Sequence, residues 1–412
     1  MILRGNLNIA GPVPVNVENT PAAEDKPFAL VAMDDNDWFT PWMNRQQILS
    51  RLGAMGWPVL YSTGAFTVWE RKTANWQQAN HYPDVVSADN VLVEKRGRRF
   101  CIWPGKGFLH RLAVGFHARF LKRSLQQGHD KPLLFYCYNP QFADYLDALR
   151  PVRTVFHIRD YYLKAETKIP VKDRFETLCN RADLIIASGA DMARGVPDKD
   201  QHKLHIIPNG ADAAAFQAAL QLPEPDDLKE IPHPRIGYVG NVSKKFDVDL
   251  LDQLSAMRPD WHFVIVGELI LEGDDLALWQ KCVARSNVHF LNFKQTAEVP
   301  AYVAHMDVNA MFYRVRGGWW EFGYPLKMHE YLATGHPVVS TELPAIREFE
   351  RVIDIVHGPE ECMSAIERAV AGRGKGSREE RQAVAFANTW DQRCQQIDEL
   401  LQGLAVQPEG AE

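Results

Sequence analysis

The chain has 412 residues, of which 46% are hydrophobic and 24% charged, and its net charge is −6. This composition is that of a globular protein, and the length predicts two domains because one domain usually holds about 100 to 200 residues. No apolar run reaches the roughly 18 residues that a membrane-spanning helix needs. The overall acidity disfavours nucleic acid as a partner. The six cysteines lie far apart without a CxxC pair, so we expect core thiols in a cytoplasmic protein.

Residues 1–27 are expected to form a loose N-terminal arm, because they lack the basic and then apolar pattern of a signal peptide. From residue 28 onward, short apolar runs alternate with amphipathic stretches, a rhythm typical of βα units and a parallel sheet. The runs lie at 28–33, 58–62, 132–138, 154–158, 184–188 and 204–208. Residues 28–212 are therefore predicted to form one doubly wound domain.

Residues 213–234 are predicted to be a linker, since four prolines and several acids interrupt the apolar rhythm there. A second series of apolar runs begins at residue 235, which predicts another doubly wound domain over 235–376. A final helix is predicted in 377–412. Two such domains would enclose a ligand cleft at the carboxyl ends of their strands.

Three acids, Asp34, Asp35 and Asp37, follow the first predicted strand. At this end of a strand a carboxylate could act as the base for an acceptor hydroxyl, and Asp35 is the catalytic candidate. The spacing also matches a metal-binding DxD motif, which is common by chance. Capping of the following helix is the simpler interpretation and the one we favour.

A basic stretch runs from residue 95 to residue 131, with ten Lys or Arg and a single acid. Apolar side chains recur every four residues within it: Phe108, Leu112, Phe116 and Phe120. We expect residues 95–123 to rest on an anionic membrane surface. The alternative is an ordinary helix packed on the sheet with solvated arginines.

His157 and Asp160 follow the apolar run at 154–158 and are the other two catalytic candidates. Both lie near the carboxyl end of a predicted strand, where open α/β sheets bind ligands. His157 alternates with Phe156 and Ile158, so it could equally be a hydrogen-bonded histidine inside the sheet.

The segment PLKMHEYLATGHPVVST, residues 325–341, predicts a helix that begins at a proline and ends at a glycine. The first N–H groups, at Leu326 and Lys327, would point towards an anion beside the Lys327 ammonium. Glu330, one turn later, could accept both hydroxyls of a ribose. The pattern favours a nucleoside diphosphate site, while a surface helix with a Lys–Glu pair is the alternative.

This segment resembles the nucleotide-binding helix of GT-B glycosyltransferases, close to family 4 (group 1), which typically reads P-L-K-x-x-E-Y-L-A-x-G-x-P-V-V. Residues 181–193, 205–212 and 235–251 resemble other stretches of that family in the same order, so the likeness covers about residues 28–400. The resemblance implies an α/β protein of the GT-B fold, with two Rossmann-like domains and an interdomain cleft. It also implies that the final helix in 377–412 crosses back to the first domain. It implies a hexosyltransferase whose Glu330 holds the nucleotide ribose and whose His157 or Asp160 faces the donor sugar.

The remaining donor-side residues are also carried over from the resemblance. Gly240 and Asn241 lie in the loop that opens the donor domain. Lys244 and Lys245 are the nearest match to an Arg–Lys pair that neutralises the diphosphate leaving group, although a solvated helix start would look the same. The family's second glutamate would fall at Phe322, with Glu321 one place away, so we name Glu321 and leave retention or inversion open.

The sequence thus predicts transfer of a sugar from a UDP or GDP sugar to a carbohydrate or lipid-linked acceptor, in polysaccharide or glycoconjugate synthesis. No cofactor or bound metal is expected, because lysines and helix N-termini can stabilise the leaving group. The protein would work in the cytoplasm, at the inner face of the membrane. A nucleotide-sugar epimerase and a non-catalytic scaffold of the same fold are the alternatives. A dinucleotide-dependent dehydrogenase is disfavoured because neither domain opens with GxGxxG.

Overall fold

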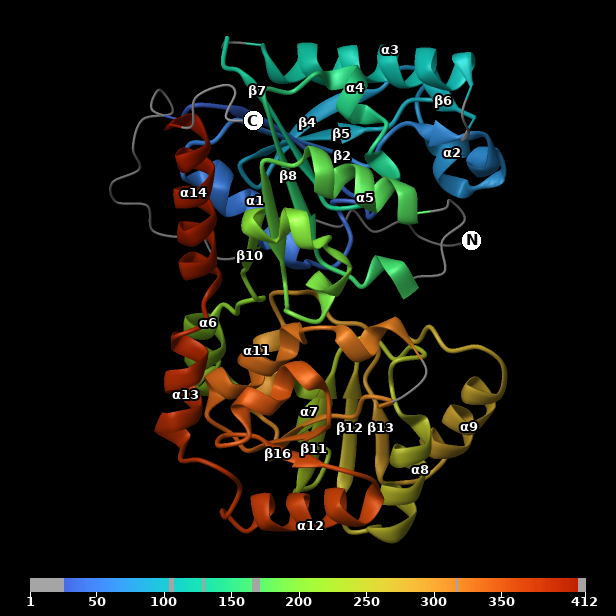
Figure 1. Cartoon of the computed structure of the whole chain (residues 1–412). Coiled ribbons are helices and arrows are strands. Elements are labelled where there is room, and N and C mark those ends of the chain that lie inside the picture. The colour runs from blue at the N-terminus through green and yellow to red at the C-terminus, as the bar shows by residue number, and fades with distance from the viewer. Residues whose placement is uncertain (1–25, 104–106, 128–129, 165–170, 316–317, 407–412) are drawn as a thin grey trace.

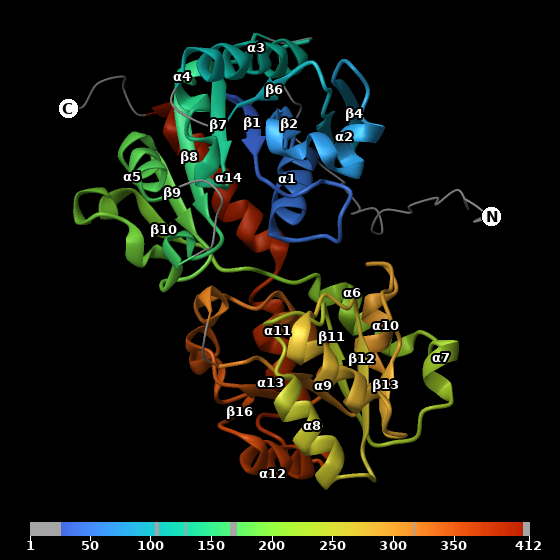
Figure 2. The same ribbon diagram turned by 90° about the vertical axis from the view of Figure 1, so that its right-hand side faces the viewer.

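The computed structural model describes residues 26–406, except 104–106, 128–129, 165–170 and 316–317 (Figure 1). Two α/β domains stand one above the other in both views (Figure 2). The first is built on an eight-stranded sheet and the second on a six-stranded sheet. Two doubly wound domains are what the alternation of apolar runs predicts.

The first sheet is parallel except for its last strand, which pairs antiparallel with its neighbour. Its strands in spatial order are β10 (Leu204–Ile206), β9 (Leu184–Ala187), β8 (Arg153–Ile158), β7 (Leu133–Cys137), β1 (Ala29–Met33), β2 (Val59–Ser62), β5 (Val91–Lys95) and β4 (Asp84–Ala88). A separate pair joins β3 (Phe66–Thr67) to β6 (Cys101–Ile102). Strands β4 and β5 were not expected from the sequence, because β4 is a half-exposed edge strand without an apolar run.

Helices cover both faces of the first sheet. They are α1 (Asn44–Ala54), α2 (Ala74–Gln78), α3 (Phe108–Leu125), α4 (Tyr145–Leu149) and α5 (Lys172–Arg181). Alternate residues of β1 point to opposite faces, so Leu30 packs with α1 while Val31 packs with α3 and α5. Burial on both faces explains why the central strands are continuous apolar runs.

The second sheet is parallel throughout. Its strands in spatial order are β13 (Val288–Phe290), β12 (His262–Val266), β11 (Arg235–Val239), β14 (Val308–Met311), β15 (Val338–Thr341) and β16 (Asp354–Val356). Its helices are α8 (Val248–Met257), α9 (Gly273–Val283), α10 (Val299–Ala304), α11 (Leu326–Thr334) and α12 (Pro359–Val370). In a parallel sheet all carboxyl ends lie at one edge, which here includes the start of α11.

The segment between the domains, 213–234, contains two short helices, α6 (Ala213–Ala218) and α7 (Asp226–Lys229), and a 3-10 turn at Ala219–Gln221. Phe216 and Leu228 are buried in a core cluster that also holds residues of α10 and α11. The segment predicted as a linker is thus packed on the second domain over part of its length.

The C-terminal segment is two helices, where the sequence suggested one. Helix α13 (Arg378–Phe386) packs beside α11, and α14 (Trp390–Val406) packs on α1 of the first domain (Figure 1). The break is explained by backbone bonds to Ala211, whose N–H donates to the Asn388 carbonyl and whose carbonyl accepts from the Trp390 N–H. Between α13 and α14 the backbone therefore pairs with the segment at Ala211 and does not continue as a helix.

All six cysteines are free, and five of them are buried, as expected for core thiols. Within the described residues, no helix combines the length and apolar character needed to cross a membrane.

Candidate active site

Three carboxylates at the carboxyl ends of β1 and β8 are held by one guanidinium group, that of Arg159. Its Nη2 atom lies 2.9 Å from Asp34 Oδ1 and 2.7 Å from Asp35 Oδ1, and its Nη1 atom lies 3.0 Å from Asp160 Oδ2. Strands β1 and β8 both pair with β7, so their ends are near neighbours. The structure brings together Asp35 and Asp160, which the sequence offered as separate candidates. It adds Arg159, which could have been recognised as the cation directly after β8, opposite two strand-end acids.

The neighbours Asp34 and Asp35 differ in protonation. Asp34 is fully buried, and burial raises its pKa to about 7 against the opposing charges of Arg159 and Arg45. Burial acts in the same direction on Asp35, but Arg159 and hydrogen bonds outweigh it and lower the pKa of that carboxyl. The Asp35 side chain is 44% exposed. Asp35 is therefore the ionised and accessible member of the pair, which suits a base.

The helix-capping interpretation of these acids is wrong for α1. That helix begins after Met43, whose N–H donates to Gln46 Oε1 at 3.0 Å. Asp37 Oδ1 instead accepts from the Phe39 N–H at 2.9 Å and closes a turn in the loop before the helix. The favoured interpretation failed because the loop between β1 and α1 is longer than a direct cap allows.

His157 lies inside the domain and not beside Asp160. It is 1% exposed, its Nδ1 atom is 2.8 Å from the Tyr136 hydroxyl, and its ring stacks on Tyr138. Burial, with Arg159 adding to it, lowers the pKa of His157 to about 3. The structure thus shows a neutral histidine whose surroundings match the alternative interpretation, that of a packed residue in the sheet.

On the second domain, Lys327 lies against the end of β11. Its Nζ atom is 3.7 Å from the ring centroid of Tyr238. A Cβ added to Gly240, where φ is +148°, would lie 2.4 Å from the same nitrogen, so a side chain at position 240 would displace the ammonium group. Tyr331 ties α11 to β11, because its hydroxyl oxygen accepts from the Val239 N–H at 2.7 Å. Burial lowers the pKa of Lys327 to about 7.

Glu330 follows Lys327 by one turn of α11. Burial raises its pKa to about 7; Lys327 opposes this shift, and Asp212 of the interdomain segment adds to it. No ion pair joins Glu330 to Lys327 in the part of the chain that the structure describes. Leu326 is the first residue of α11 after Pro325, and the first N–H groups of a helix have no partner inside it. A cation, a carboxylate and free helix N–H groups therefore lie within one turn of helix.

The other donor-side candidates lie around this turn. Asn241 is exposed, and its carbonyl accepts from the Tyr238 hydroxyl at 3.2 Å. Lys244 is exposed, with Nζ 5.6 Å from the Trp320 ring. Glu321 is half-buried in the 3-10 helix η8 (Trp319–Phe322). Of these three residues, Asn241 is linked to the surroundings of Lys327 through Tyr238, whose ring lies 3.7 Å from Lys327 Nζ.

Two groups of site residues face each other across the domain boundary. The residues at the carboxyl ends of β1 and β8 are called the first edge below, and those at the end of β11 and the first turn of α11 are called the second edge. The ring centroids of Tyr161 and Phe322 are 4.7 Å apart, and Asn209 Nδ2 donates to the Tyr324 carbonyl at 2.9 Å. Burial lowers the pKa of Lys245, and the charge of Asp160 in the first domain opposes the shift. The acids of the first domain and the lysines of the second therefore form one site region.

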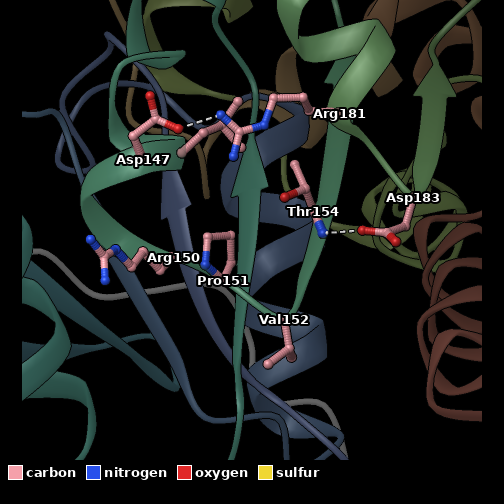
Figure 3. A pocket seen from close by; sticks show the side chains of 8 residues that line it. Asp147, Arg150, Pro151, Val152, Thr154, Arg181 and Asp183 are labelled. Carbon is pink, nitrogen blue, oxygen red and sulfur yellow. Dashed lines mark hydrogen bonds and ion pairs between the residues drawn. The ribbon is translucent and has the colours of Figure 1, made fainter. Parts of the chain in front are cut away.

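A pocket of about 560 Å³ lies elsewhere, at the amino ends of β8 and β9 (Figure 3). Its lining includes Arg150, and it is closed by an Arg181–Asp147 ion pair and by the Thr154 N–H, which donates to Asp183 at 2.7 Å. Thr154 is at the start of β8, whereas Arg159 follows its end. The pocket is thus at the opposite edge of the sheet from the candidate site.

Among the described residues, no group of three or more His, Cys, Asp or Glu side chains could hold a metal ion. The three acids at Arg159 are engaged by that cation.

Comparison with known proteins identifies the second domain. Residues 233–371 match the family described as glycosyl transferases group 1. Over 228 residues the chain is 28% identical to the putative teichuronic acid biosynthesis glycosyltransferase TuaH of Bacillus subtilis, covering 53% of this chain and 57% of that protein. The chain thus spans little more than half the length of this curated relative.

Solved structures match nearly the whole chain in fold. One, described as trehalose-6-phosphate from E. coli bound with UDP-2-fluoro glucose, has a TM-score of 0.63 at 13% identity, covering 91% of this chain and 99% of that one. A UDP-forming α,α-trehalose-phosphate synthase from Burkholderia xenovorans in complex with glucose-6-phosphate has a TM-score of 0.62 at 13% identity, covering 91% and 100%. The two-domain GT-B fold expected from the sequence is confirmed.

Proposed function

We propose that this chain transfers a sugar from a nucleoside diphosphate sugar to an acceptor bound between its two domains. The observation that carries the proposal is the first turn of α11, where Lys327 lies over Gly240 and Glu330 follows one turn later. A diphosphate there would meet the ammonium group and free helix N–H groups, and the ribose would reach Glu330. Asp35 and Asp160 lie across the domain boundary, on the side where an acceptor would enter.

In this proposal the leaving diphosphate is stabilised by fixed positive charge without a metal ion. Lys327 and the α11 N-terminus contact it directly, and Lys245 adds a second cation close to Asp160. Leu326, Gly240 and Asn241 contribute backbone to the same site. The carboxylate of Asp35 would accept the proton of the acceptor hydroxyl. Glu321 would lie towards the sugar, since its neighbour Phe322 touches the first domain.

The donor and acceptor classes are supported by the relatives. One structural neighbour is described with a UDP sugar, which favours UDP over GDP. The Bacillus relative is named for teichuronic acid biosynthesis, which favours a carbohydrate or lipid-linked acceptor in polysaccharide synthesis. We propose accordingly that the protein acts in the cytoplasm, peripheral to an anionic membrane that it meets through residues 95–123.

The ribose contact is tested with Glu330→Gln, which keeps the side-chain shape and removes the charge. Loss of hydrogen bonds to a charged group costs about 1.5 to 3 kcal/mol, so UDP affinity in calorimetry should fall about 10- to 100-fold. The matched control is Glu272→Gln, at an exposed glutamate of the same domain. The variant should also bind UDP and 2′-deoxy-UDP equally. If it still prefers UDP as strongly as wild type does, the ribose assignment is wrong.

Product analysis separates the reaction classes. A transferase should consume a UDP sugar faster when sugar acceptors are supplied, and Asp35→Asn should lose that transfer while it keeps donor affinity. An epimerase would convert the donor with no acceptor present. A scaffold would bind the donor and leave it unchanged in every acceptor mixture, and either of these last two results would overturn the transferase proposal.

A further inference from the structure

Helix α3 presents an apolar and basic face that nothing in the described chain covers. The helix runs across the end of the first domain that is farthest from the second domain, in both views (Figure 1, Figure 2). Its exposed apolar residues, with Trp103 just before it, are Trp103, Phe108, Leu109, Leu112 and Phe116. Its exposed basic residues are Arg111, Arg119 and Arg123. These eight residues are called the α3 face below.

The other side of α3 is fixed to the domain. Val114 and Leu121 are buried in the core beneath it, and His117 bridges the Tyr145 hydroxyl at 2.6 Å and Glu94 Oε1 at 2.7 Å. His110 Nε2 lies 2.9 Å from Asp144. The helix cannot turn to bury its outer side chains without breaking these bonds. The α3 face is therefore a preformed surface and not a loose amphipathic segment.

Aromatic side chains on this face point to solvent, although the sequence leaves their direction open. Phe108 is 67% exposed and Phe116 is 53% exposed. Phe120, which continues the same four-residue repeat, instead packs on Phe100, with ring centroids 5.9 Å apart. The first three members of the repeat, Phe108, Leu112 and Phe116, are thus available for contact. Clustered exposed aromatics mark an interaction surface, whereas single exposed apolar residues do not.

The charge of the α3 face indicates which kind of partner it would bind. Helix α3 contains no acidic residue, and Arg111, Arg119 and Arg123 form no ion pair with the rest of the described chain. A second copy of the chain, docked about a twofold axis, would bring these arginines against their own counterparts. An anionic lipid surface supplies the opposite charge and an apolar interior together.

We propose that the α3 face docks the protein on an anionic bilayer, with Phe108, Leu112 and Phe116 entering the headgroup region and the arginines at lipid phosphates. This proposal rests on the proposed function, because it specifies the surface through which the protein would meet the membrane. It does not depend on whether the protein transfers a sugar. Because α3 lies across the end of the first domain, a flat bilayer contact would hold the first domain at the surface and the second domain away from it (Figure 1). An acceptor head group would then approach from the side of the first domain.

The test is flotation of the full chain with phosphatidylcholine vesicles, with and without phosphatidylglycerol, at low and high salt. Wild type should float only with the anionic vesicles and be released by salt, because salt screens surface charge. Each arginine near an acidic leaflet contributes about fivefold to the partition coefficient. Arg111→Gln, Arg119→Gln and Arg123→Gln together should therefore lower the coefficient about a hundredfold.

Matched variants separate this surface from general charge and hydrophobicity. The charge control replaces three exposed cations of the second domain, Lys281, Arg347 and Arg351, by Gln. Phe108→Gln with Phe116→Gln should weaken flotation in low salt, while Phe293→Gln with Phe386→Gln, at exposed positions of the second half of the chain, should not.

Three results would overturn the proposal: wild type that stays with the soluble fraction at low salt, α3 variants that float like wild type, and charge controls that lose as much as the α3 variants. Concentration-dependent dimers that the Phe108 and Phe116 changes abolish would also overturn it, in favour of self-association. UDP-sugar binding is measured on the same samples. Intact UDP-sugar binding in the α3 variants shows that they are folded, and loss of flotation with retained binding separates docking from the transfer proposal.

Discussion

The two facing edges of the site differ in how their charges are satisfied. On the first domain, Arg159 already contacts Asp34, Asp35 and Asp160, so the charges compensate one another without a ligand. On the second domain, Lys327 and Glu330 are both shifted towards their neutral forms by burial. Burial without a partner disfavours the charged form of either sign. Burial raises the pKa of Asp34 as well, but Arg159 contacts that acid together with Asp35 and Asp160. The acids of the first edge therefore already have a cationic partner. Lys327 and Glu330 form no ion pair with each other in the described part of the chain, and an anionic, hydroxyl-bearing ligand would supply their partners.

We expect the largest effect on stability from removing the guanidinium group of Arg159, which contacts all three acids of the first edge. Arg159→Met leaves Asp34 buried opposite Arg45 alone, and breaking a buried pair costs about 3 to 5 kcal/mol of unfolding free energy. Asp34 carries a proton in the folded state up to about pH 7, so it destabilises the fold as pH rises through that value. Without Arg159 its pKa rises further.

Urea unfolding at several pH values measures this effect. The difference between wild type and Arg159→Met should therefore grow as pH rises above neutral, and shrink on the acid side, where Asp34 is already protonated. Arg347→Met removes an exposed arginine paired with Glu342 and should change little. A pH-independent difference would mean that Arg159 acts through packing alone, and the comparison of the two edges would lose its electrostatic basis.

Removing the ammonium group of Lys327 tests whether the second edge binds an anionic ligand. Lys327→Met is expected to weaken UDP-glucose binding about 10- to 100-fold, since a hydrogen bond to a charged group contributes about 1.5 to 3 kcal/mol. The matched control is Lys281→Met, at an exposed lysine of α9.

The pH dependence of binding separates the two titrating groups. The pKa of Lys327 is about 7 without ligand, and a bound diphosphate raises it, so this group favours binding below pH 7 and loses affinity above it. Glu330, also near 7, acts with the opposite sign because its ionised form accepts the ribose hydroxyls. In Glu330→Gln, affinity measured by calorimetry should fall with rising pH. In Lys327→Met it should rise. Flat profiles in both variants would contradict a ligand site at this turn.

How far the sequence predicts the site depends on the range of the interactions. That Lys327 and Glu330 share the first turns of one helix was predictable, because their spacing and the Pro325 start are local properties, while their donor-binding role stays a prediction. Arg159 could be recognised only as a cation after an apolar run, since its contacts with the acids appear only when the ends of β1 and β8 lie near each other in the sheet. His157 shows the same limit, because alternation in a strand does not tell which face carries Tyr136 and Tyr138. The two doubly wound domains followed from the apolar rhythm, whereas edge strand β4 has no such rhythm.

The smallest expected effect tests the contact that joins the two edges. Phe322 and Tyr161 come from different domains, with ring centroids 4.7 Å apart, and an aromatic pair contributes about 0.5 to 1.5 kcal/mol beyond its buried area. A double-mutant cycle with Phe322→Leu and Tyr161→Leu, measured by urea unfolding, should show a coupling energy of about this size. Tyr161 follows Asp160 and Phe322 follows Glu321, so the contact sets how close an acid of the first edge lies to the second. If the two single losses simply add, the edges are positioned by α14 and the interdomain segment, and the ring pair has no part in it.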